Sequence, residues 1–274
     1  MPAVYTVLLY MIIFLYGVII GSFVNVCILR LPKHESIIPG SHCMDCGHRL
    51  RWYDLFPLFS YLLLKGRCRY CGAKISCQYP LVEALNGVLY VIVFMANGVS
   101  LQSILYCLMA SALLVISVID WRTYEIPPAC NLVLLVLGVI FCFIDRANIG
   151  EHVIGLVSVS AFLYILWFLS AGRAIGGGDV KLMGAAGLIL GWKLILLSFL
   201  LGCILGSVIH LIRMKVSKAE RVLAMGPYLS VGILICALWG NRMIDWYLAL
   251  ALGEWRLGKL HKMLYKIPFD AEER

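Results

Sequence analysis

Val115-Ile116-Ser117-Val118-Ile119-Asp120 places a single carboxylate at the end of an otherwise apolar run. A second isolated carboxylate, Asp179, closes the stretch Gly176-Gly177-Gly178-Asp179. Apolar runs of about 20 residues predict transmembrane helices, and a charged side chain at membrane depth is costly enough to mark a functional site by default. The two aspartates are therefore the first candidate functional residues of a membrane protein.

The composition supports this class. Hydrophobic residues make up 62% of the 274 residues, charged residues 14%, and the mean hydropathy is +0.92. A soluble globular protein carries roughly 25% charged residues, so that class is excluded. The formal charge of +8 suggests nucleic acid at first sight. Cations beside membrane spans instead record the positive-inside rule, so we expect membrane lipid around the chain and no nucleic-acid partner.

The pattern predicts an all-α polytopic membrane protein with about seven or eight membrane segments. The expected spans are residues 5–29, 81–97, 101–119, 128–144, 151–171, 193–213 and 226–245. The first span lacks a basic segment before it and is too long for a signal-peptide core, so we expect it to be retained. Residues 182–192 are too short to span comfortably and could form a short or re-entrant helix that returns the chain.

The expected organisation is a first transmembrane helix at 1–29, a polar module at 30–80, a membrane core at 81–245 and a tail at 246–274. The module carries Lys or Arg at 30, 33, 49, 51, 65, 67, 69 and 74, against three acidic residues. This excess predicts a cytosolic module and an external N-terminus. The tail mixes leucine, tryptophan and basic residues and could lie on the membrane surface.

Four of the 11 cysteines form two Cys-x-x-Cys pairs with 21 residues between them. The pairs are Cys43 with Cys46 and Cys68 with Cys71. Thiolates at this spacing can close a tetrahedral zinc site, and four of them leave no open position, so the role would be structural. A loop of about 50 residues with few aliphatic side chains needs such folding energy from a metal. Glycine follows each pair, at Gly47 and Gly72, as a tight turn requires.

Other interpretations of the cysteines remain open at this stage. The pairs could be redox-active or unliganded thiols, although a reducing cytosol disfavours disulfides. Cys77 lies in the module without a partner in either pair. Six further cysteines lie singly in or at the ends of apolar spans, where thiols act as small hydrophobic side chains.

If Asp120 and Asp179 meet, two like charges in a poorly solvated site must share a proton. One carboxylate can then act as general base on water and the other as general acid to a carbonyl, which is aspartyl proteolysis. The glycines before Asp179 would let this loop approach a neighbouring helix closely. Three other interpretations compete: Asp120 pairs with an arginine at the interface, Asp179 is a helix N-cap, or both belong to an ion path.

Several motifs resemble the type IV prepilin peptidase family of intramembrane aspartyl proteases. Gly176-Gly177-Gly178-Asp179 fits its Gly-x-Gly-Asp signature, with the continuation Val180-Lys-Leu-Met-Gly-Ala-Ala-Gly187. The other matching segments are Gly21–Pro32, Arg51-Trp-Tyr-Asp-Leu-Phe-Pro57, Gly66-Arg-Cys-Arg-Tyr-Cys-Gly72, Gln78-Tyr-Pro-Leu-Val-Glu-Ala-Leu85 and Met225-Gly-Pro-Tyr-Leu229. The resemblance covers roughly residues 17 to 240 in one order, so it is specific.

The resemblance implies a bifunctional enzyme of the bacterial cytoplasmic membrane. Members cut the basic leader from type IV prepilins and pseudopilins after a glycine, then methylate the new N-terminus with S-adenosylmethionine. The catalytic pair carries over to Asp120 and Asp179, and the zinc ligands to Cys43, Cys46, Cys68 and Cys71. Gly176, Gly178 and Lys181 would support the active-site loop. One departure is that Pro128 stands where an aspartate is common, which leaves Glu125 as the only candidate helper carboxylate.

The methyl-transfer site is less defined. No Gly-x-Gly-x-x-Gly motif follows a strand, so a Rossmann-type cofactor site is not expected. Gly66 could permit close backbone approach to a cofactor, or could simply make a turn. Glu83 could hold a ribose hydroxyl or the substrate amine, or could pair with a cation of the module. Asn25 and Asn86 could equally make hydrogen bonds between helices.

Three function classes follow from these observations. The first is the bifunctional peptidase and methyltransferase, and the second is a peptidase whose zinc module only docks the substrate. The third is a transport protein that uses the aspartates as an ion path. The intact four-cysteine module favours the first over simpler preflagellin-type peptidases, which lack it, and the Gly-x-Gly-Asp context favours both enzymes over transport.

Overall fold

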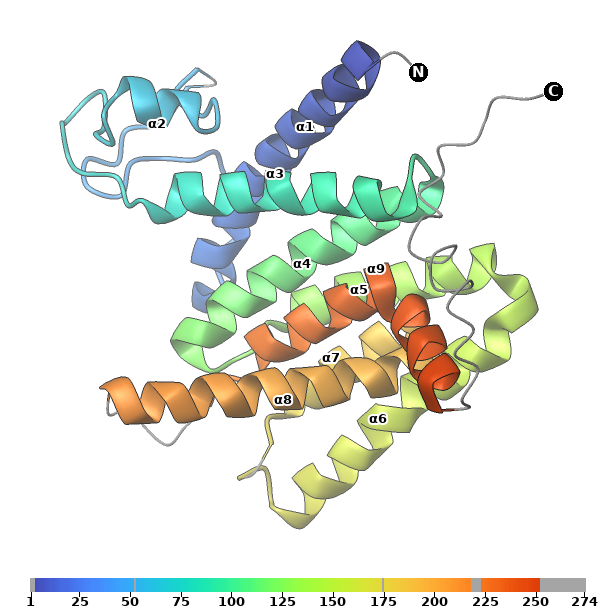
Figure 1. Cartoon of the computed structure of the whole chain (residues 1–274). Coiled ribbons are helices and arrows are strands. Elements are labelled where there is room, and N and C mark those ends of the chain that lie inside the picture. The colour runs from blue at the N-terminus through green and yellow to red at the C-terminus, as the bar shows by residue number, and fades with distance from the viewer. Residues whose placement is uncertain (1–2, 52, 174, 218–222, 252–274) are drawn as a thin grey trace. The chain divides into compact units, whose positions relative to one another are not determined.

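The structure, a computed structural model, describes residues 3–51, 53–173, 175–217 and 223–251. Most of these residues are helical (Figure 1). The α-helices are α1 (Ala3–Arg30), α2 (Phe59–Leu63), α3 (Gln78–Asn97), α4 (Leu101–Thr123), α5 (Pro128–Ile144), α6 (Ile149–Leu169), α7 (Gly177–Leu190), α8 (Trp192–Ser217) and α9 (Gly226–Ala251). Two short 3₁₀ turns, Leu31–Lys33 and Arg146–Asn148, accompany them. Within the described residues, β structure is limited to two isolated bridges. The prediction of an all-α membrane protein is confirmed.

Each predicted span is a helix in the structure. Six of the described helices are long and apolar enough to cross a membrane, namely α1, α3, α4, α6, α8 and α9, and α5 is a shorter apolar helix. The short segment predicted at 182–192 begins earlier than expected, since α7 starts at Gly177. Asp179 therefore lies inside the first turn of α7. At the other end, α9 continues through the start of the predicted tail to Ala251, and residues 252–274 lie outside the described residues.

Polar side chains join α1 to α3. The Asn86 amide donates a hydrogen bond of 2.7 Å to the backbone oxygen of Gly17, and the Asn25 amide donates one of 3.0 Å to Tyr79. Gly21 lets the helices approach closely, because a Cβ atom there would lie 2.7 Å from the Cα of Glu83. The interpretation of the two asparagines as bonds between helices is confirmed. Without water, each such bond satisfies a polar group that would otherwise be buried unpaired.

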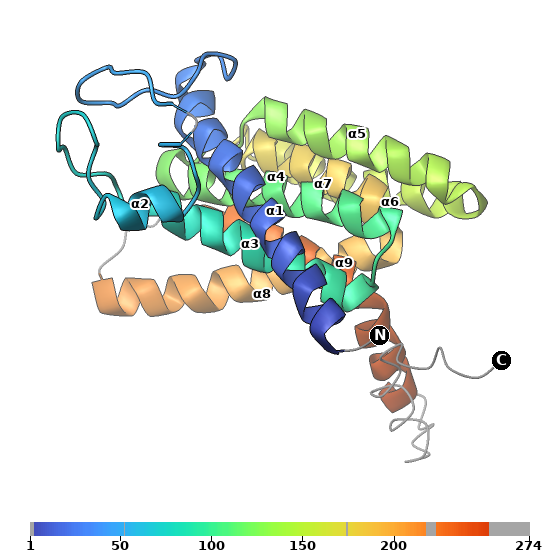
Figure 2. The same ribbon diagram turned by 90° about the horizontal axis from the view of Figure 1, so that it is seen from above.

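The most buried described helices are α4 and α7. Of the 18 consecutive residues of α4 that are most apolar, 72% are buried, the largest share among the six candidate spans. In α7, every residue from Leu182 to Leu190 is buried, and the helix packs against α5, α6 and α8 (Figure 2). Asp120 lies at the last turn of α4 and Asp179 at the first turn of α7, so both aspartates belong to central helices.

The four-cysteine module fills the connection between α1 and α3 and contains α2 (Figure 1). Together with the helices up to Leu238 it belongs to one compact unit, and a second unit begins at Trp239 within α9. Arg30, at the end of α1, organises the start of the module. Its guanidinium donates hydrogen bonds to the backbone oxygens of Ser36, Pro39 and Gly40, which explains why this arginine is buried.

Candidate functional site

Asp120 lies at the end of α4, in its last turn. The helix stops because Tyr124 adopts a left-handed conformation (φ 57°), with its N–H bonded to the Asp120 backbone oxygen at 2.9 Å. The Asp120 residue is only 5% exposed. Its carboxylate accepts a hydrogen bond of 2.8 Å from the backbone N–H of Gly226, at the start of α9.

The arginine-paired interpretation of Asp120 does not describe this geometry. Arg122, the nearest arginine in sequence, donates its hydrogen bond to the side chain of Gln78 in α3. Arg213 lies over the ring of Trp121, 4.4 Å from the ring centroid. The cations beside the end of α4 therefore have other partners, while Asp120 points into the helical core.

Asp179 is the third residue of α7. The N-cap of that helix is Gly176, whose backbone oxygen accepts the Asp179 N–H at 3.1 Å, so the prediction that Asp179 could be the N-cap is wrong. Gly178 explains why the loop is glycine-rich: a Cβ atom at this position would lie 2.9 Å from the Cβ of Ile126, in the segment between α4 and α5. The expected close approach of this loop to a neighbouring segment is confirmed.

The two aspartates come together where three helix ends converge. The charge of Asp120 acts electrostatically on Asp179, although 58 residues separate them in sequence. Asp120 faces the first N–H of α9, and Asp179 sits in the first turn of α7. Helix N-termini carry partial positive charge, which stabilises a negative charge on either carboxylate. Two acids whose charges repel one another favour the state in which one is protonated and the other ionised.

The other residues predicted for this loop lie nearby in sequence but differ in exposure. Gly176 and Lys181 are exposed and Gly178 is half-buried, whereas Asp179 is partly open. Glu125, the candidate helper carboxylate, is exposed one residue after the left-handed Tyr124. Asp179 is therefore the more exposed of the two acids, while Asp120 is enclosed by protein.

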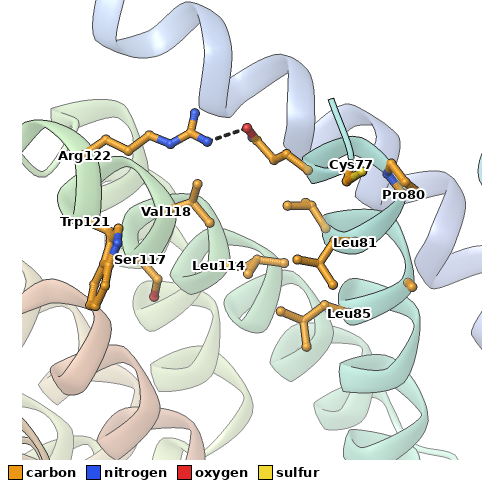
Figure 3. Close-up of a pocket in the computed structure, with 12 residues that line it drawn as sticks. Cys77, Pro80, Leu81, Leu85, Leu114, Ser117, Val118, Trp121 and Arg122 are labelled. Carbon is orange, nitrogen blue, oxygen red and sulfur yellow. Dashed lines mark hydrogen bonds between the residues drawn. The ribbon is translucent and has the colours of Figure 1, made fainter. Parts of the chain in front are cut away.

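An apolar groove of about 890 Å³ runs between α3 and α4 (Figure 3). Leu81, Leu85, Leu114 and Val118 line it, and the Arg122 side chain reaches across one end towards α3. An apolar lining suits a hydrocarbon chain or an apolar segment. It does not suit a charged, hydrogen-bonding cofactor such as S-adenosylmethionine.

The four cysteines of the two Cys-x-x-Cys pairs form one cluster. Each pair with its turn is called a knuckle below, Cys43 to Cys46 being the first and Cys68 to Cys71 the second. Their sulfur atoms all lie within 4.8 Å of one another, and the Cys43 and Cys71 sulfurs are 3.8 Å apart. Tetrahedral zinc with Zn–S bonds of about 2.3 Å requires sulfur separations near 3.8 Å, so the donor set fits this ion. Gly47 and Gly72 have positive φ values of 67° and 73°, which confirms the predicted tight turns.

The thiols of this cluster differ in acidity. The backbone N–H groups of Cys46 and Asp45 lower the pKa of Cys43 to about 7. For Cys71 the backbone of Ala73 acts in the same direction, but desolvation and the neighbouring thiols prevail and raise its pKa to about 12. Four thiolates crowded together repel one another, so full ionisation at neutral pH requires a cation among them.

The two knuckles are also tied together by side chains. Asp54 accepts hydrogen bonds from the Arg69 guanidinium at 2.7 Å and from the Tyr70 hydroxyl at 3.0 Å. The ring of Tyr70 lies 3.7 Å from that of His48, beside the first knuckle. Desolvation raises the pKa of Asp54, but the hydrogen bonds from Arg69, the Arg51 backbone and Tyr70 outweigh it and hold that pKa below its ordinary value.

Gly66 and Glu83, the residues predicted for the methyl-transfer site, both have structural partners. Gly66 has φ 68°, and a Cβ atom there would lie 2.9 Å from the Tyr61 hydroxyl, so it makes a turn against that ring. The buried Glu83 carboxylate accepts a hydrogen bond of 2.9 Å from the Leu58 N–H and also interacts with the Ser22 hydroxyl. Glu83 thus bonds to the backbone of the module and not to one of the module's lysine or arginine side chains, the alternative raised by the sequence.

Sequence reasoning missed Gly226 as a member of the site. The segment Met225-Gly-Pro-Tyr-Leu229 resembles a family motif, but its sequence predicts no contact with Asp120. A Gly-Pro pair at the start of an apolar span is a helix-start signal, but it does not say which side chain the free N–H groups will meet.

Comparison with known proteins decides the family. The chain matches the model of the bacterial peptidase A24 N-terminal domain over residues 15–97 and that of the type IV leader peptidase family over residues 107–211. The prepilin leader peptidase/N-methyltransferase of Aeromonas salmonicida is 32% identical over 280 residues, covering 89% of this chain and 96% of that protein. The chain belongs to the type IV leader peptidase family.

Other members of the type IV leader peptidase family are similarly close. The proteins of the same name from Xanthomonas campestris pv. campestris and Pseudomonas aeruginosa are 34% and 31% identical, each covering 86% of this chain and 93% and 92% of the relative, respectively. No solved structure matches the chain. Asp120 and Asp179 fall within the region matched to the type IV leader peptidase model, and the four knuckle cysteines fall within the N-terminal domain.

Proposed function

We propose that this chain is a bifunctional prepilin leader peptidase and N-methyltransferase. Its family makes it a protease and a methyltransferase of a multi-pass membrane type. The substrates in this proposal are type IV prepilins or pseudopilins, whose basic leader is cut after a glycine. The new N-terminal residue is then methylated with S-adenosylmethionine. The names of the relatives and the residue-level resemblance support both steps.

In the proposed cleavage, Asp120 and Asp179 share one proton. One carboxylate removes a proton from water as it attacks the peptide carbonyl, and the other donates its proton to the carbonyl oxygen. The observation that carries this proposal is the convergence of both carboxylates where α4 ends and α7 and α9 begin. Charge that develops on either acid is stabilised there by helix N-termini.

For the module we propose a structural zinc ion held by Cys43, Cys46, Cys68 and Cys71. The sulfur geometry described above supports it. Bound zinc would supply cross-linking and charge neutralisation, and four sulfur ligands would leave no position for substrate. The chain's own contribution is the Asp54 network, which holds the second knuckle to residues 51–54.

The cofactor site for methyl transfer is also a proposal. Bound S-adenosylmethionine would supply an activated methyl group. The predicted contacts at Gly66 and Glu83 fit a supporting role better than direct ligation, because Glu83 already bonds Leu58 and Ser22. We place the reaction near the face of the module that meets α3, and the apolar groove between α3 and α4 is not its cofactor pocket.

We further propose that the chain resides in a bacterial cytoplasmic membrane, with the N-terminus outside and the module in the cytoplasm. The excess of lysine and arginine in residues 30–80 supports this orientation. The proposed cleavage site would then lie at the cytoplasmic edge of the membrane.

The test incubates the purified chain in lipid nanodiscs with a prepilin and labelled S-adenosylmethionine. Mass spectrometry of the product N-terminus should show both leader removal and one added methyl group. Leader removal with an unmethylated product would leave a peptidase whose module docks the substrate. If the chain shows neither activity, and vesicles that contain it show an ion flux that depends on Asp120 and Asp179, a transport protein would be favoured.

A further inference from the structure

We infer that the backbone amide of Gly226 is a positioning group for Asp120, and that this position requires glycine. The inference rests on the proposed role of Asp120 in cleavage. It concerns a residue in α9, outside the Gly-x-Gly-Asp segment and outside the region matched to the type IV leader peptidase model. The hydrogen bond between the two is 2.8 Å long, joins residues 106 positions apart, and is buried.

The bond satisfies both partners. Gly226 is the first residue of α9, and the first N–H groups of a helix have no acceptor inside it. The N–H of Gly226 is buried here, so leaving it unpaired would be costly. Asp120 supplies the acceptor from a different helix and meets the positive end of α9. Asp120 therefore caps α9, and α9 in return fixes one oxygen of the carboxylate.

This anchoring defines what the carboxylate can do. A carboxylate has two oxygens, and Gly226 holds Oδ2. The other oxygen is left to contact water or to share the proton with Asp179. Rotation of the side chain away from this position breaks the bond to α9, whereas a half-turn of the carboxylate only exchanges two equivalent oxygens. The orientation of the acid is thus set by α9, although the acid itself belongs to α4.

The contact leaves no room for a side chain at residue 226. A Cβ atom on Gly226 would lie 2.7 Å from Oδ2 of Asp120 and 3.0 Å from both its Cβ and Cγ. Relief would require Asp120 to turn away or α9 to retreat, and either movement loses the 2.8 Å bond. Pro227 removes one means of local adjustment, because its ring fixes φ at the second position of the helix.

The decisive variant is Gly226→Ala. For cleavage, we expect kcat to fall about 100-fold, as misplacement of a catalytic group by about 1 Å would produce. KM should change little, and the pH profile of cleavage should shift because the environment of one acid has changed. Methylation of a pilin that has already been cleaved should continue, which shows that the chain is folded.

The matched control is Gly202→Ala. A Cβ atom there would lie 2.9 Å from the Leu229 side chain, so the variant crowds the interface of α8 and α9 without touching Asp120. It should retain cleavage and the wild-type pH profile. If Gly202→Ala lowers cleavage as much as Gly226→Ala, general packing of α9 explains the loss and the inference is overturned.

A second variant removes the donor without adding any atom. Glycolic acid at position 226 replaces the N–H by an ester oxygen and keeps the glycine geometry. We expect the same direction of change, with reduced kcat and a shifted pH profile. Wild-type chain and Asp120→Asn are measured alongside. A wild-type chain that fails to cleave refutes the proposed function, whereas normal cleavage by the ester variant refutes only the role of Gly226.

Discussion

The carboxylate of Glu83, inside α3, accepts a hydrogen bond of 2.9 Å from the backbone N–H of Leu58 in the four-cysteine module. Leu58 itself has a positive φ of 60°, which is unusual for a bulky residue other than glycine. The bond therefore holds a strained point of the module against a membrane helix. Because Glu83 is buried, a change at this residue affects how the module is held as well as any direct chemistry.

Glu83→Gln should reduce methyl transfer more than cleavage. The amide keeps an acceptor oxygen but removes the charge that strengthens the bond to Leu58, so the module is held less firmly over α3. We expect a several-fold fall in the methylated fraction, with leader removal near wild type, in mass spectra of the pilin N-terminus. The control is Glu35→Gln, at an exposed module residue. Fully methylated pilin from Glu83→Gln would place the methyl-transfer site elsewhere.

Gly66→Ala should also impair methyl transfer selectively. The new Cβ meets the Tyr61 hydroxyl, and the positive φ adds a backbone cost of about 1 kcal/mol. Gly72→Ala also places a side chain at a positive φ (73°) in the module but has open space around the new Cβ, so it separates backbone strain from the contact with Tyr61. If cleavage and methylation fall in parallel in Gly66→Ala, the residue is a structural turn and not part of a site.

Asp120→Asn and Asp179→Asn should each abolish leader cleavage, since neither acid can be spared from a pair that shares a proton. We expect a loss of at least about 1,000-fold in each single variant, read by gel shift of the prepilin. Methylation of a pre-cleaved pilin should persist. Glu35→Gln, which alters an exposed carboxylate of the four-cysteine module, is the control and should cleave normally. Substantial turnover by either Asn variant would rule out the aspartyl mechanism.

Zinc should bind at one ion per chain, and Ser at any of the four knuckle cysteines should release it. Elemental analysis gives the stoichiometry. In the Ser variants, amide hydrogen exchange should speed up more in residues 40–75 than in the membrane helices, because the metal supplies much of the module's folding energy. Cys77→Ser, outside the cluster, should keep the metal. A metal-free chain whose module still exchanges its amide hydrogens slowly would contradict the proposed structural zinc.

Asp54 should stabilise the module through a carboxylate that stays ionised. Its pKa is lowered on folding, so its contribution is fully present above the ordinary value of 3.8 and is lost as pH falls through the lowered value. Asp54→Asn should therefore speed exchange in residues 40–75 by the same factor at about pH 8 and about pH 5. Asp45→Asn, at an exposed acid in the first knuckle, is the control. A difference that disappears between these two pH values would show that folding raises the pKa of Asp54 instead of lowering it.

The sequence by itself determined the helices and the identity of the chemical groups. Apolar length requires spans in a membrane, because a backbone in lipid must satisfy its own hydrogen bonds, and thus residues such as 101–119 were predictable. The four cysteines were predictable because zinc ligands within a short loop follow a local spacing. The close approach before Asp179 was predictable in kind, since only glycine allows it.

Tertiary structure alone decided which groups meet. Asp120 and Gly226 are far apart in the chain, and no local pattern says that the N-terminus of α9 will be capped by a side chain of α4. The same holds for Glu83 and Leu58. The helix starts could be read from sequence, because capping and propensity act over a few residues. The partner of each free N–H depends on helix packing, which sums many contacts between distant segments and leaves no short-range signature.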